Sequence, residues 1–405
     1  MNKRLILVAS VALASGAALV VLGGDLDPPA GAVAPTMKTL ADVEPRGAIR
    51  NDFVTITPIV INASGSYYLA EDILSLPNQH GVEITADNVT LDLNGYTIRG
   101  NTEVGSLDGV HIAAGVDNVT IRNGTIQFFG GDGVGGSASG DARLGQLRLI
   151  FNADDGVDIG ERAIVTDCTA IDNGDIGIRT SEGARLSRCI AENNGTWGVL
   201  VGFYSETRDC LARDNTTGFS LGFGSTAQSC ASSNNTGAGF SFAFNCTAHQ
   251  CTASSNGSTG IFAQRGIVTD SLVTSNDGAG VLLADGGLLR DSVVRSNGVN
   301  GVGGGSRCYI SGCVITGNTG DGIDLAGDNN VVMGCDLGSN TGVGIRVPGD
   351  QNRISENHSL DTILVQGVDN LIVKNSATVS AAVGNQAAIN STDPDTAGPW
   401  SNFTP

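Results

Sequence analysis

The sequence predicts an all-β solenoid, a parallel β-helix in which about 21 residues form each turn. Three observations predict it: Asn recurs at steps of 20 to 22 residues, a Cys or Ser stands five residues before each of these Asn residues, and Gly followed by an apolar residue comes soon after most of them. The Asn positions are Asn173, Asn194, Asn215, Asn235, Asn256, Asn276, Asn297, Asn318 and Asn340. A repeat that keeps its length over so much chain predicts stacked structural units, here called rungs.

Within each rung the apolar residues alternate with polar ones. We count rung positions from the residue five before the repeated Asn, which is Cys168, Cys189, Cys210, Cys230, Cys251, Ser271, Ser292, Cys313 or Cys335. Positions 0, +2, +10 and +12 are small or apolar, and period-two alternation is typical of short strands. Small inner residues and the absence of a helical pattern predict a right-handed, three-faced helix. A β-propeller is disfavoured because its blades need about 40 residues. The repeated Asn is expected to occupy the left-handed backbone region at a turn and to hydrogen-bond from rung to rung.

The chain divides by composition into five segments. An apolar run after Lys3 and Arg4 is typical of a secretory signal, and the Pro-, Ala- and Gly-rich stretch after it of a linker. The open end of a solenoid needs to be covered by a cap, and the strand-like segment before the repeats is the candidate for this cap. We predict a signal peptide at 1–22, a linker at 23–52, an N-terminal cap at 53–80, the parallel β-helix at 81–376 and a C-terminal tail at 377–405 that packs on the helix. Trp400 and Phe403 of this tail are expected to cover an apolar outward stripe at position +1, formed by Ile190, Leu211, Leu272, Val293 and Val314.

Composition and charge limit the partners. The 405 residues include 58 Gly without a triplet period, which excludes collagen, and 40% hydrophobic residues, which excludes wholesale disorder. The net charge of −19 argues against nucleic acid, because no basic stripe is present to displace counterions. A polysaccharide is a compatible partner, although a polyanion would need a local basic patch. After the signal no segment is long and apolar enough to span a membrane. We expect a monomer that is secreted, periplasmic or at the cell surface.

The Cys residues are predicted to be mostly free, buried thiols. Export would ordinarily suggest disulfides for nine Cys. Seven of them, however, fall on one rung position, where stacked neighbours lie about 4.8 Å apart, a little too far for a relaxed disulfide.

Two segments resemble the right-handed parallel β-helix superfamily, the pectate-lyase-like group. They are the sequence Asn-Val-Thr-Leu-Asp-Leu-Asn-Gly at 88–95 and the repeated Cys, Asn and Gly positions from 168 to 344. The resemblance covers about residues 54–376. It implies the fold, and it implies one of several activities, because the family includes polysaccharide lyases, glycoside hydrolases, epimerases, copper-delivery periplasmic proteins and noncatalytic surface proteins. The family's pectin-degrading enzymes use a Lys or Arg base or an Arg-x-Lys element. Here the only Lys residues are Lys3, Lys38 and Lys374, and that element is absent.

The candidate site is an acidic cluster in the N-terminal half of the repeats. His111, Asp158 and Arg179 share the outward position +11, and Asp154 and Asp175 share +7. Stacked carboxylates about 5 Å apart raise one another's pKa or hold a cation, so Asp154 and Asp175 are candidate calcium ligands. The catalytic candidates are His111, Asp154, Asp155, Asp158 and Arg179, with a carboxylate as acid or base and Arg179 holding a substrate carboxylate. The Gly-rich loop 130–140 is a candidate cleft wall.

Two classes of function stay open at this point. Asp, Asn and Gly are also the ordinary residues of tight turns, so the same cluster fits a solvated surface. The acidic segment from Asp321 to Asp328 is interpreted as an ordinary repeat unit with polar outward positions. The four His residues are too far apart in sequence to predict a metal site of two His and a carboxylate. The first hypothesis is a noncatalytic scaffold that contacts glycans or partners through one face. The second is a carbohydrate-active enzyme, lyase or hydrolase, and metal delivery is a third.

Overall fold

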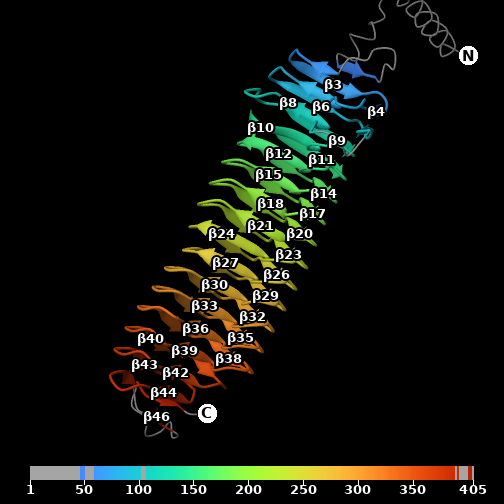
Figure 1. Cartoon of the computed structure of the whole chain (residues 1–405). Coiled ribbons are helices and arrows are strands. Elements are labelled where there is room, and N and C mark those ends of the chain that lie inside the picture. Colours follow the sequence, from blue (N-terminus) through green and yellow to red (C-terminus); the bar gives the residue numbers. More distant parts are fainter. Residues whose placement is uncertain (1–45, 51–58, 102–105, 388–389, 392–399, 404–405) are drawn as a thin grey trace, which may run out of the picture. The chain divides into compact units, whose positions relative to one another are not determined.

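The computed structural model describes residues 46–50, 59–101, 106–387, 390–391 and 400–403, which form strands and turns without a helix, from β1 (Gly47–Ile49) to β47 (Asn402–Phe403). The strands stack as successive rungs that follow the sequence from the blue to the red end of the coil (Figure 1). Val157 pairs in parallel with Ile178, and Ile178 with Val199, so that one turn takes 21 residues. The predicted parallel β-helix with about 21 residues in each turn is therefore confirmed.

One strand from each rung joins a 16-stranded parallel sheet, here called sheet B, which carries positions +10 to +12. Its strands are β2 (Val60–Ile61), β5 (Val82–Ile84), β8 (Val110–Ile112), β10 (Val134–Gly140), β12 (Val157–Glu161), β15 (Ile178–Thr180), β18 (Trp197–Val201), β21 (Thr217–Leu221), β24 (Phe240–Phe244), β27 (Ile261–Gln264), β30 (Val281–Leu283), β33 (Val302–Gly304), β36 (Ile323–Leu325), β39 (Ile345–Val347), β42 (Ile363–Val365) and β44 (Val379–Ala381).

The other strands form two further ladders. One contains β1, β3 (Gly65–Leu69), β6 (Val89–Asp92), β13 (Ile164–Thr166), β16 (Arg185–Ser187), β19 (Glu206–Arg208), β22 (Thr226–Gln228), β25 (Thr247–His249), β28 (Ile267–Thr269), β31 (Leu288–Arg290), β34 (Tyr309–Ser311), β37 (Val331–Met333), β40 (Arg353–Ser355), β43 (Leu371–Val373) and β45 (Gln386–Ala387). The other contains β4 (Ile73–Leu74), β7 (Thr97–Arg99), β14 (Thr169–Ile171), β17 (Ile190–Glu192), β20 (Leu211–Arg213), β23 (Ala231–Ser233), β26 (Thr252–Ser254), β29 (Leu272–Thr274), β32 (Val293–Arg295), β35 (Val314–Thr316), β38 (Asp336–Gly338) and β41 (His358–Ser359).

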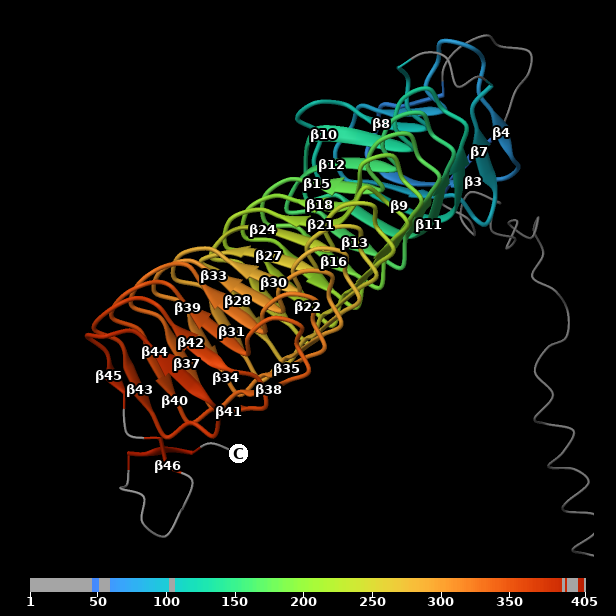
Figure 2. The ribbon, with the colours of Figure 1, turned by 60° about the horizontal axis from the view of Figure 1, so that its bottom comes forward.

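The long strands β9 (Thr120–Gln127) and β11 (Arg143–Ile150) belong to both of these ladders and join them into one 29-stranded sheet. Near the end of the coil, β46 (Asn390–Ser391) pairs with β47. The turned view in Figure 2 shows the strands of all three ladders arranged around the coil. The three-faced cross-section and the N-terminal cap stay predictions, because strand pairing by itself defines neither.

Left-handed residues bend each regular rung at three positions, and Arg162, with φ of 55°, is at the first of them, position −6. Asp167 and Asp172 have φ of 55° and 56°, and Arg188 and Asn193 repeat this one rung later. These are positions −1 and +4, so the expectation that the repeated Asn at +5 takes the left-handed conformation was wrong. The residue before it bends the chain, which leaves the Asn side chain free to turn inward.

The inward-turned Asn side chains form a continuous amide ladder, as predicted. Asn152 Nδ2 donates to Asn173 Oδ1 at 3.0 Å, equivalent bonds link each repeated Asn to the next, and Asn340 Nδ2 ends the ladder on Asp361 Oδ2 at 3.1 Å. The ladder needs Gly at position +9, since a Cβ on Gly177 would lie 2.7 Å from Asn194 Nδ2. Burial of these amides also argues against glycosylation there.

The interior is a column of small and apolar side chains. All nine Cys are free and buried, which confirms the predicted state of the thiols. They pack as small hydrophobic groups, and the thiols also donate to nearby carbonyl oxygens, as Cys168 Sγ does to Thr166 O at 3.3 Å. Burial raises the pKa of the Cys168 thiol to about 12, so this thiol stays protonated.

The terminal segments fall only partly within the described residues. The predicted signal peptide, most of the linker and residues 53–58 lie outside them. From residue 59 the predicted cap consists of rung strands, since β2 pairs with β5 and β3 with β6. At the other end pairing continues past residue 376, through β44 and β45. The expectation that Trp400 and Phe403 cover the apolar stripe was wrong: Phe403 N donates to Asn375 O at the last rung, Trp400 is 60% exposed, and Val314 of the stripe is 40% exposed.

No helix long and apolar enough to cross a membrane occurs among the residues that the structure describes.

Candidate functional site

The outward position +11 of sheet B aligns the candidate residues on one face. Glu83 pairs with His111, His111 with Gly135, Gly135 with Asp158, and Asp158 with Arg179. These residues come from β5, β8, β10, β12 and β15, consecutive rungs whose parallel pairing makes equivalent positions neighbours. The structure therefore brings the sequence-predicted His111, Asp158 and Arg179 onto one surface, with Gly135 between the first two.

Beside this column lies a ladder of three carboxyl groups that sequence reasoning largely missed. Asp108 Oδ1 accepts the backbone N–H of Asp132 at 3.0 Å, Asp132 Oδ1 accepts that of Asp155 at 3.0 Å, and Asp155 Oδ1 accepts that of Ile176 at 2.8 Å. Only Asp155 was among the candidates. Asp108 and Asp132 sit in rungs of irregular length, but the tripeptide Asp-Gly-Val begins at 108, at 132 and at 155 and could have revealed the ladder.

Burial and mutual repulsion keep part of this ladder protonated. Burial, and then the charges of Asp108 and Asp155, raise the pKa of Asp132 to about 8. Burial raises the pKa of Asp155 to about 7, although the Ile176 N–H and Arg179 oppose the shift. Burial also raises the pKa of Asp158. At neutral pH the Asp132 carboxyl therefore holds a proton it can donate, while remaining partly exposed.

Arg179 lies among three carboxylates. Its Nε is 3.2 Å from Asp155 Oδ2, its Nη1 is 3.8 Å from Asp158 Oδ2, and its Nη2 is 3.6 Å from Asp175 Oδ2. The buried Nε has no aligned hydrogen-bond acceptor, so this contact is electrostatic. A guanidinium already surrounded by carboxylates has little charge left for an anionic ligand. The predicted role of Arg179 in holding a substrate carboxylate is thus disfavoured by its surroundings.

A His–Asp pair stands at the other end of the column. His111 Nδ1 lies 2.8 Å from Asp108 Oδ2, and the ring of His80 stacks on that of His111 with centroids 4.3 Å apart. The expectation that the His residues form no set with a carboxylate was wrong, because the chain between 80 and 108 returns His80 to the neighbouring rung. The hydrogen bond to Asp108 raises the pKa of His111, while burial and then His111 lower the pKa of His80.

His80, Asp108 and His111 could offer metal-ligand atoms within 4.8 Å of one another. Their hydrogen bonds disfavour this use. His80 Nδ1 accepts the backbone N–H of Asp108 at 2.9 Å, so a neutral His80 carries its proton on Nε2. If His111 donates through Nδ1 to Asp108, its own free lone pair is on Nε2, which suits a base oriented by a carboxylate.

Open space in front of the carboxyl ladder depends on one glycine. A Cβ on Gly135 would lie 2.4 Å from Asp108 Oδ2 and 3.1 Å from Asp132 Oδ2. Asp154, which is exposed, completes the arrangement: oxygens of Asp132, Asp154 and Asp155 all lie within 4.8 Å of one another. The site thus combines a protonated carboxyl group with a second, solvent-facing carboxylate.

Of the two predicted calcium ligands, Asp154 and Asp175, Asp175 already has other partners. Asp175 Oδ1 accepts a hydrogen bond from Thr196 Oγ1 at 2.5 Å, and Asp175 Oδ2 faces Arg179. Calcium binding by Asp154 and Asp175 stays a prediction, and an oxygen of Asp132 also lies within 4.8 Å of one of Asp154.

Part of this site occurs a second time, on β33, β36 and β39. We call this region the C-terminal copy. Asp321 N donates to Asn300 Oδ1 at 2.9 Å, Val343 N donates to Asp321 Oδ1 at 2.8 Å, and Arg346 Nε donates to Asp321 Oδ2 at 2.5 Å. Gly303 pairs with Asp324, and Asp324 pairs with Arg346. Asn300, Asp321 and Arg346 thus repeat the places of Asp132, Asp155 and Arg179.

The comparisons with known proteins agree on the fold. The family model described as "Right handed beta helix region" matches residues 59–217 and 265–393, more than half of the chain. No curated protein sequence matches the chain. The A-module of mannuronan C-5 epimerase AlgE4 from Azotobacter vinelandii is similar in structure, with a TM-score of 0.55 and 15% identity, covering 72% of this chain and 91% of that chain.

Two further solved structures are similar over most of their length. The A-module of mannuronan C-5 epimerase AlgE6 from Azotobacter vinelandii has a TM-score of 0.40 and 14% identity, covering 84% of this chain and 90% of that chain. Pectate lyase Pel9A has a TM-score of 0.33 and 15% identity, covering 83% of this chain and 82% of that chain. The similarity to the AlgE4 module, at 15% identity, shows the fold alone. With the family match over most of its rungs, this chain belongs to the right-handed β-helix family.

Proposed function

We propose that this chain is an exported carbohydrate-active enzyme that cleaves a glycosidic bond at the site formed by Asp132, Asp154 and Asp155. The observation that carries the proposal is the raised pKa of Asp132, about 8, beside a solvent-facing carboxylate. A glycosidase needs one carboxyl group that still holds its proton at working pH and a second that is ionised.

The roles follow from exposure and charge. Asp132 donates its proton to the glycosidic oxygen as the bond to the anomeric carbon breaks. Asp154 attacks the anomeric carbon from the other side, and water then hydrolyses the resulting ester while Asp132 takes a proton back. Separations of about 5–5.5 Å are typical of this retaining course, and those of inverting enzymes are longer, about 6.5–9.5 Å. Oxygens of Asp132 and Asp154 lie within 4.8 Å of one another, too close for the inverting spacing, and we therefore propose the retaining course.

Other residues support these two. Asp155 is buried and holds Asp132 in place through its backbone N–H, and Arg179 limits the charge that builds up when the carboxyls ionise. The Asp108–His111 pair borders the space above Gly135, where it can bind or deprotonate a sugar hydroxyl. The A-module of AlgE4 is named an epimerase of a polysaccharide, which supports a glycan substrate by analogy of fold only.

Export is part of the proposal. The apolar run in residues 1–22 has the composition of a secretory signal. All nine Cys are buried, seven of them at one rung position, and burial shields their thiols from the oxidising conditions outside the cytoplasm. We propose a polysaccharide as partner and a monomer as the working form.

The test is an activity panel. Neutral and acidic polysaccharides are incubated with the protein, with and without calcium, and both reducing ends and unsaturated products are measured. New reducing ends that are lost in Asp132→Asn, with the fold intact by circular dichroism, would support the hydrolase. Unsaturated products would indicate a lyase instead. Binding without any product would return the chain to the noncatalytic glycan scaffold.

A further inference from the structure

A shallow groove leads away from the candidate site along the outward face of sheet B. It begins at Arg179 and Thr180 of β15 and continues over β18, β21 and β24 to Phe262 and Gln264 of β27. Its floor is the same +11 column that carries the site, since Arg179 pairs with Leu200, Leu200 with Ser220, and Ser220 with Ser241. The groove and the site are therefore continuous.

The groove carries almost no charge. Arg179, at the end that meets the candidate site, is its only charged lining residue. Beyond it the +11 column stays uncharged for six consecutive rungs, through Leu200, Ser220, Ser241, Phe262, Leu282 and Gly303, and becomes charged again only at Asp324. The chain has a net charge of −19, and its negative field repels polyanions. The uncharged stretch also has no cationic side chain that could pair with an anionic group.

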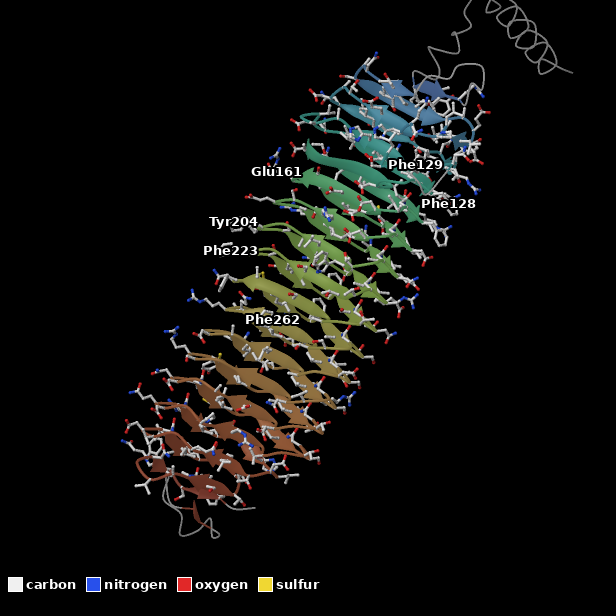
Figure 3. The ribbon with its side chains drawn as sticks, viewed as in Figure 1. Phe128, Phe129, Glu161, Tyr204, Phe223 and Phe262 are labelled. Atoms are coloured by element: carbon white, nitrogen blue, oxygen red, sulfur yellow. The ribbon has the colours of Figure 1, made fainter. Side chains whose placement is uncertain are left out.

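Aromatic side chains line the groove at intervals of one or two rungs. Phe203 and Phe244 are 54% and 49% exposed, and Phe262, one rung beyond Phe244, is partly exposed. Tyr204 and Phe223 make an edge-to-face contact at 5.6 Å on the neighbouring turn, and Figure 3 shows both along one edge of the coil, with Phe262 on the face of the sheet. Exposed aromatic side chains on this scale mark a contact surface.

We propose that this groove binds a segment of a neutral polysaccharide and feeds it into the acidic site. Successive rungs are about 4.8 Å apart, close to the advance of one sugar unit in an extended chain. A pyranose ring has an apolar C–H face that packs on an aromatic ring and hydroxyls at its edge. Phe203, Phe244 and Phe262 provide the first kind of contact, and Ser220 and Ser241 the second. This inference rests on the proposed function and narrows its substrate to an uncharged glycan.

Binding is the direct test, and it uses the full chain carrying Asp132→Asn so that the ligand stays uncleaved. Retardation in native gels is measured with soluble neutral polysaccharides (a β-glucan, a mannan, a xylan) and with a polyuronate. We expect at least one neutral polymer to bind and the polyuronate not to bind. Phe244→Ala and Phe262→Ala should each weaken that binding at least about fivefold, the range expected for losing one aromatic contact.

A matched control is available. Phe151 is 44% exposed and stacks on Phe128, which Figure 3 places at the opposite edge of the coil from Tyr204 and Phe223. Phe151→Ala removes an exposed aromatic side chain of the same kind and should leave binding unchanged. A loss of binding equal in the control and the groove variants would overturn the proposal, as would tight binding of the polyuronate alone or self-association through the groove.

The two proposals fail separately. If neutral glycan binds through the phenylalanines but the wild-type chain releases no product, the groove stands and the catalytic role of Asp132 falls. If the wild-type chain cleaves a glycan and Phe244→Ala and Phe262→Ala cleave and bind it equally well, the catalytic site stands and the groove proposal falls.

Discussion

The site around Asp132 and its C-terminal copy around Asn300 share a backbone but differ in chemistry. In both, a side-chain oxygen accepts the backbone N–H of the Asp on the next rung: Asp132 Oδ1 accepts that of Asp155 at 3.0 Å, and Asn300 Oδ1 accepts that of Asp321 at 2.9 Å. In both, that Asp meets an Arg of the following rung. The rung before Asp132 supplies Asp108 and His111, whereas the rung before Asn300 supplies Ala279 and Leu282.

The difference separates what the fold needs from what it does not. A side-chain oxygen at this position satisfies a backbone donor, and an amide does so as well as a carboxyl group. The extra acids at 108 and 132 therefore add nothing that the coil requires, and burying them next to one another costs stability. An acid such as Asp132, whose pKa burial raises and which the coil does not need, is typical of a functional site.

The largest expected effect is on catalysis. Asp132→Asn keeps the acceptor of the Asp155 N–H but removes the proton donor, so we expect cleavage of the substrate found in the panel to fall about 100-fold or more. Initial rates of reducing-end release measure this. The change Asn300→Asp in the copy is the counterpart and should leave the rate unaltered. Equal rates for the wild type and Asp132→Asn would rule out general acid catalysis by this residue.

The second effect is on stability, and it depends on pH. The folded-state pKa of Asp132, about 8, lies above the ordinary value of about 3.9. Its contribution to stability is therefore intact below about pH 4 and is lost as pH rises toward 8. Asp132→Asn should stabilise the coil by about 2–4 kcal/mol at pH 8 and by little at pH 4. Denaturation at both pH values, followed by circular dichroism, measures this.

Asn300→Asp should have the opposite sign, because it places a new carboxyl group beside Asp321 and Asp324 and removes the Asn300 Nδ2 bond to Asp324. We expect a loss that is larger at pH 8 than at pH 4. A loss that did not change with pH would mean that the introduced carboxyl group is well solvated, and burial would then not explain the raised pKa of Asp132.

A smaller effect distinguishes the two Arg residues. Arg346→Gln leaves Asp321, which is 7% exposed, without its cation, and should cost about 1–2 kcal/mol at pH 7 after allowance for the exposed part of Arg346. Arg179→Gln should cost less, because Asp155, with a pKa of about 7, can respond by taking up a proton. Urea unfolding of both variants measures the difference. A greater loss for Arg179→Gln would contradict the protonation of Asp155.

The smallest effect is a shift in one titration. The Asp108 carboxylate favours the charged form of His111, so Asp108→Asn should lower the pKa of His111. Ring-proton NMR shifts followed against pH measure it, with His249, far along the coil, as the internal control. The copy has no counterpart of this pair. An unmoved His111 titration would show that Asp108 does not orient this ring.

Much of the fold could be predicted because a constant period turns sequence distance into spatial contact. Cys168, Cys189 and Cys210 stack because each is one turn from the next, and Asn173 bonds Asn194 for the same reason. Counting by 21 also placed Asp158 beside Arg179. The constant period did not predict neighbours where rungs are longer. Asp108 and Asp132 are 24 residues apart and His80 and Asp108 are 28 apart, so the period predicted neither the carboxyl ladder nor the stacked His rings.

The sequence by itself determined the solenoid, its inward column of thiols, its rung-to-rung ladder of amides, and the face that carries the acids, because alternation and period are local properties of the chain. Only the tertiary structure decided which acids share a site, which of them stay protonated, and that an uncharged aromatic groove adjoins them. Those properties depend on burial and on distances across loops of unequal length, and neither is encoded in the repeat.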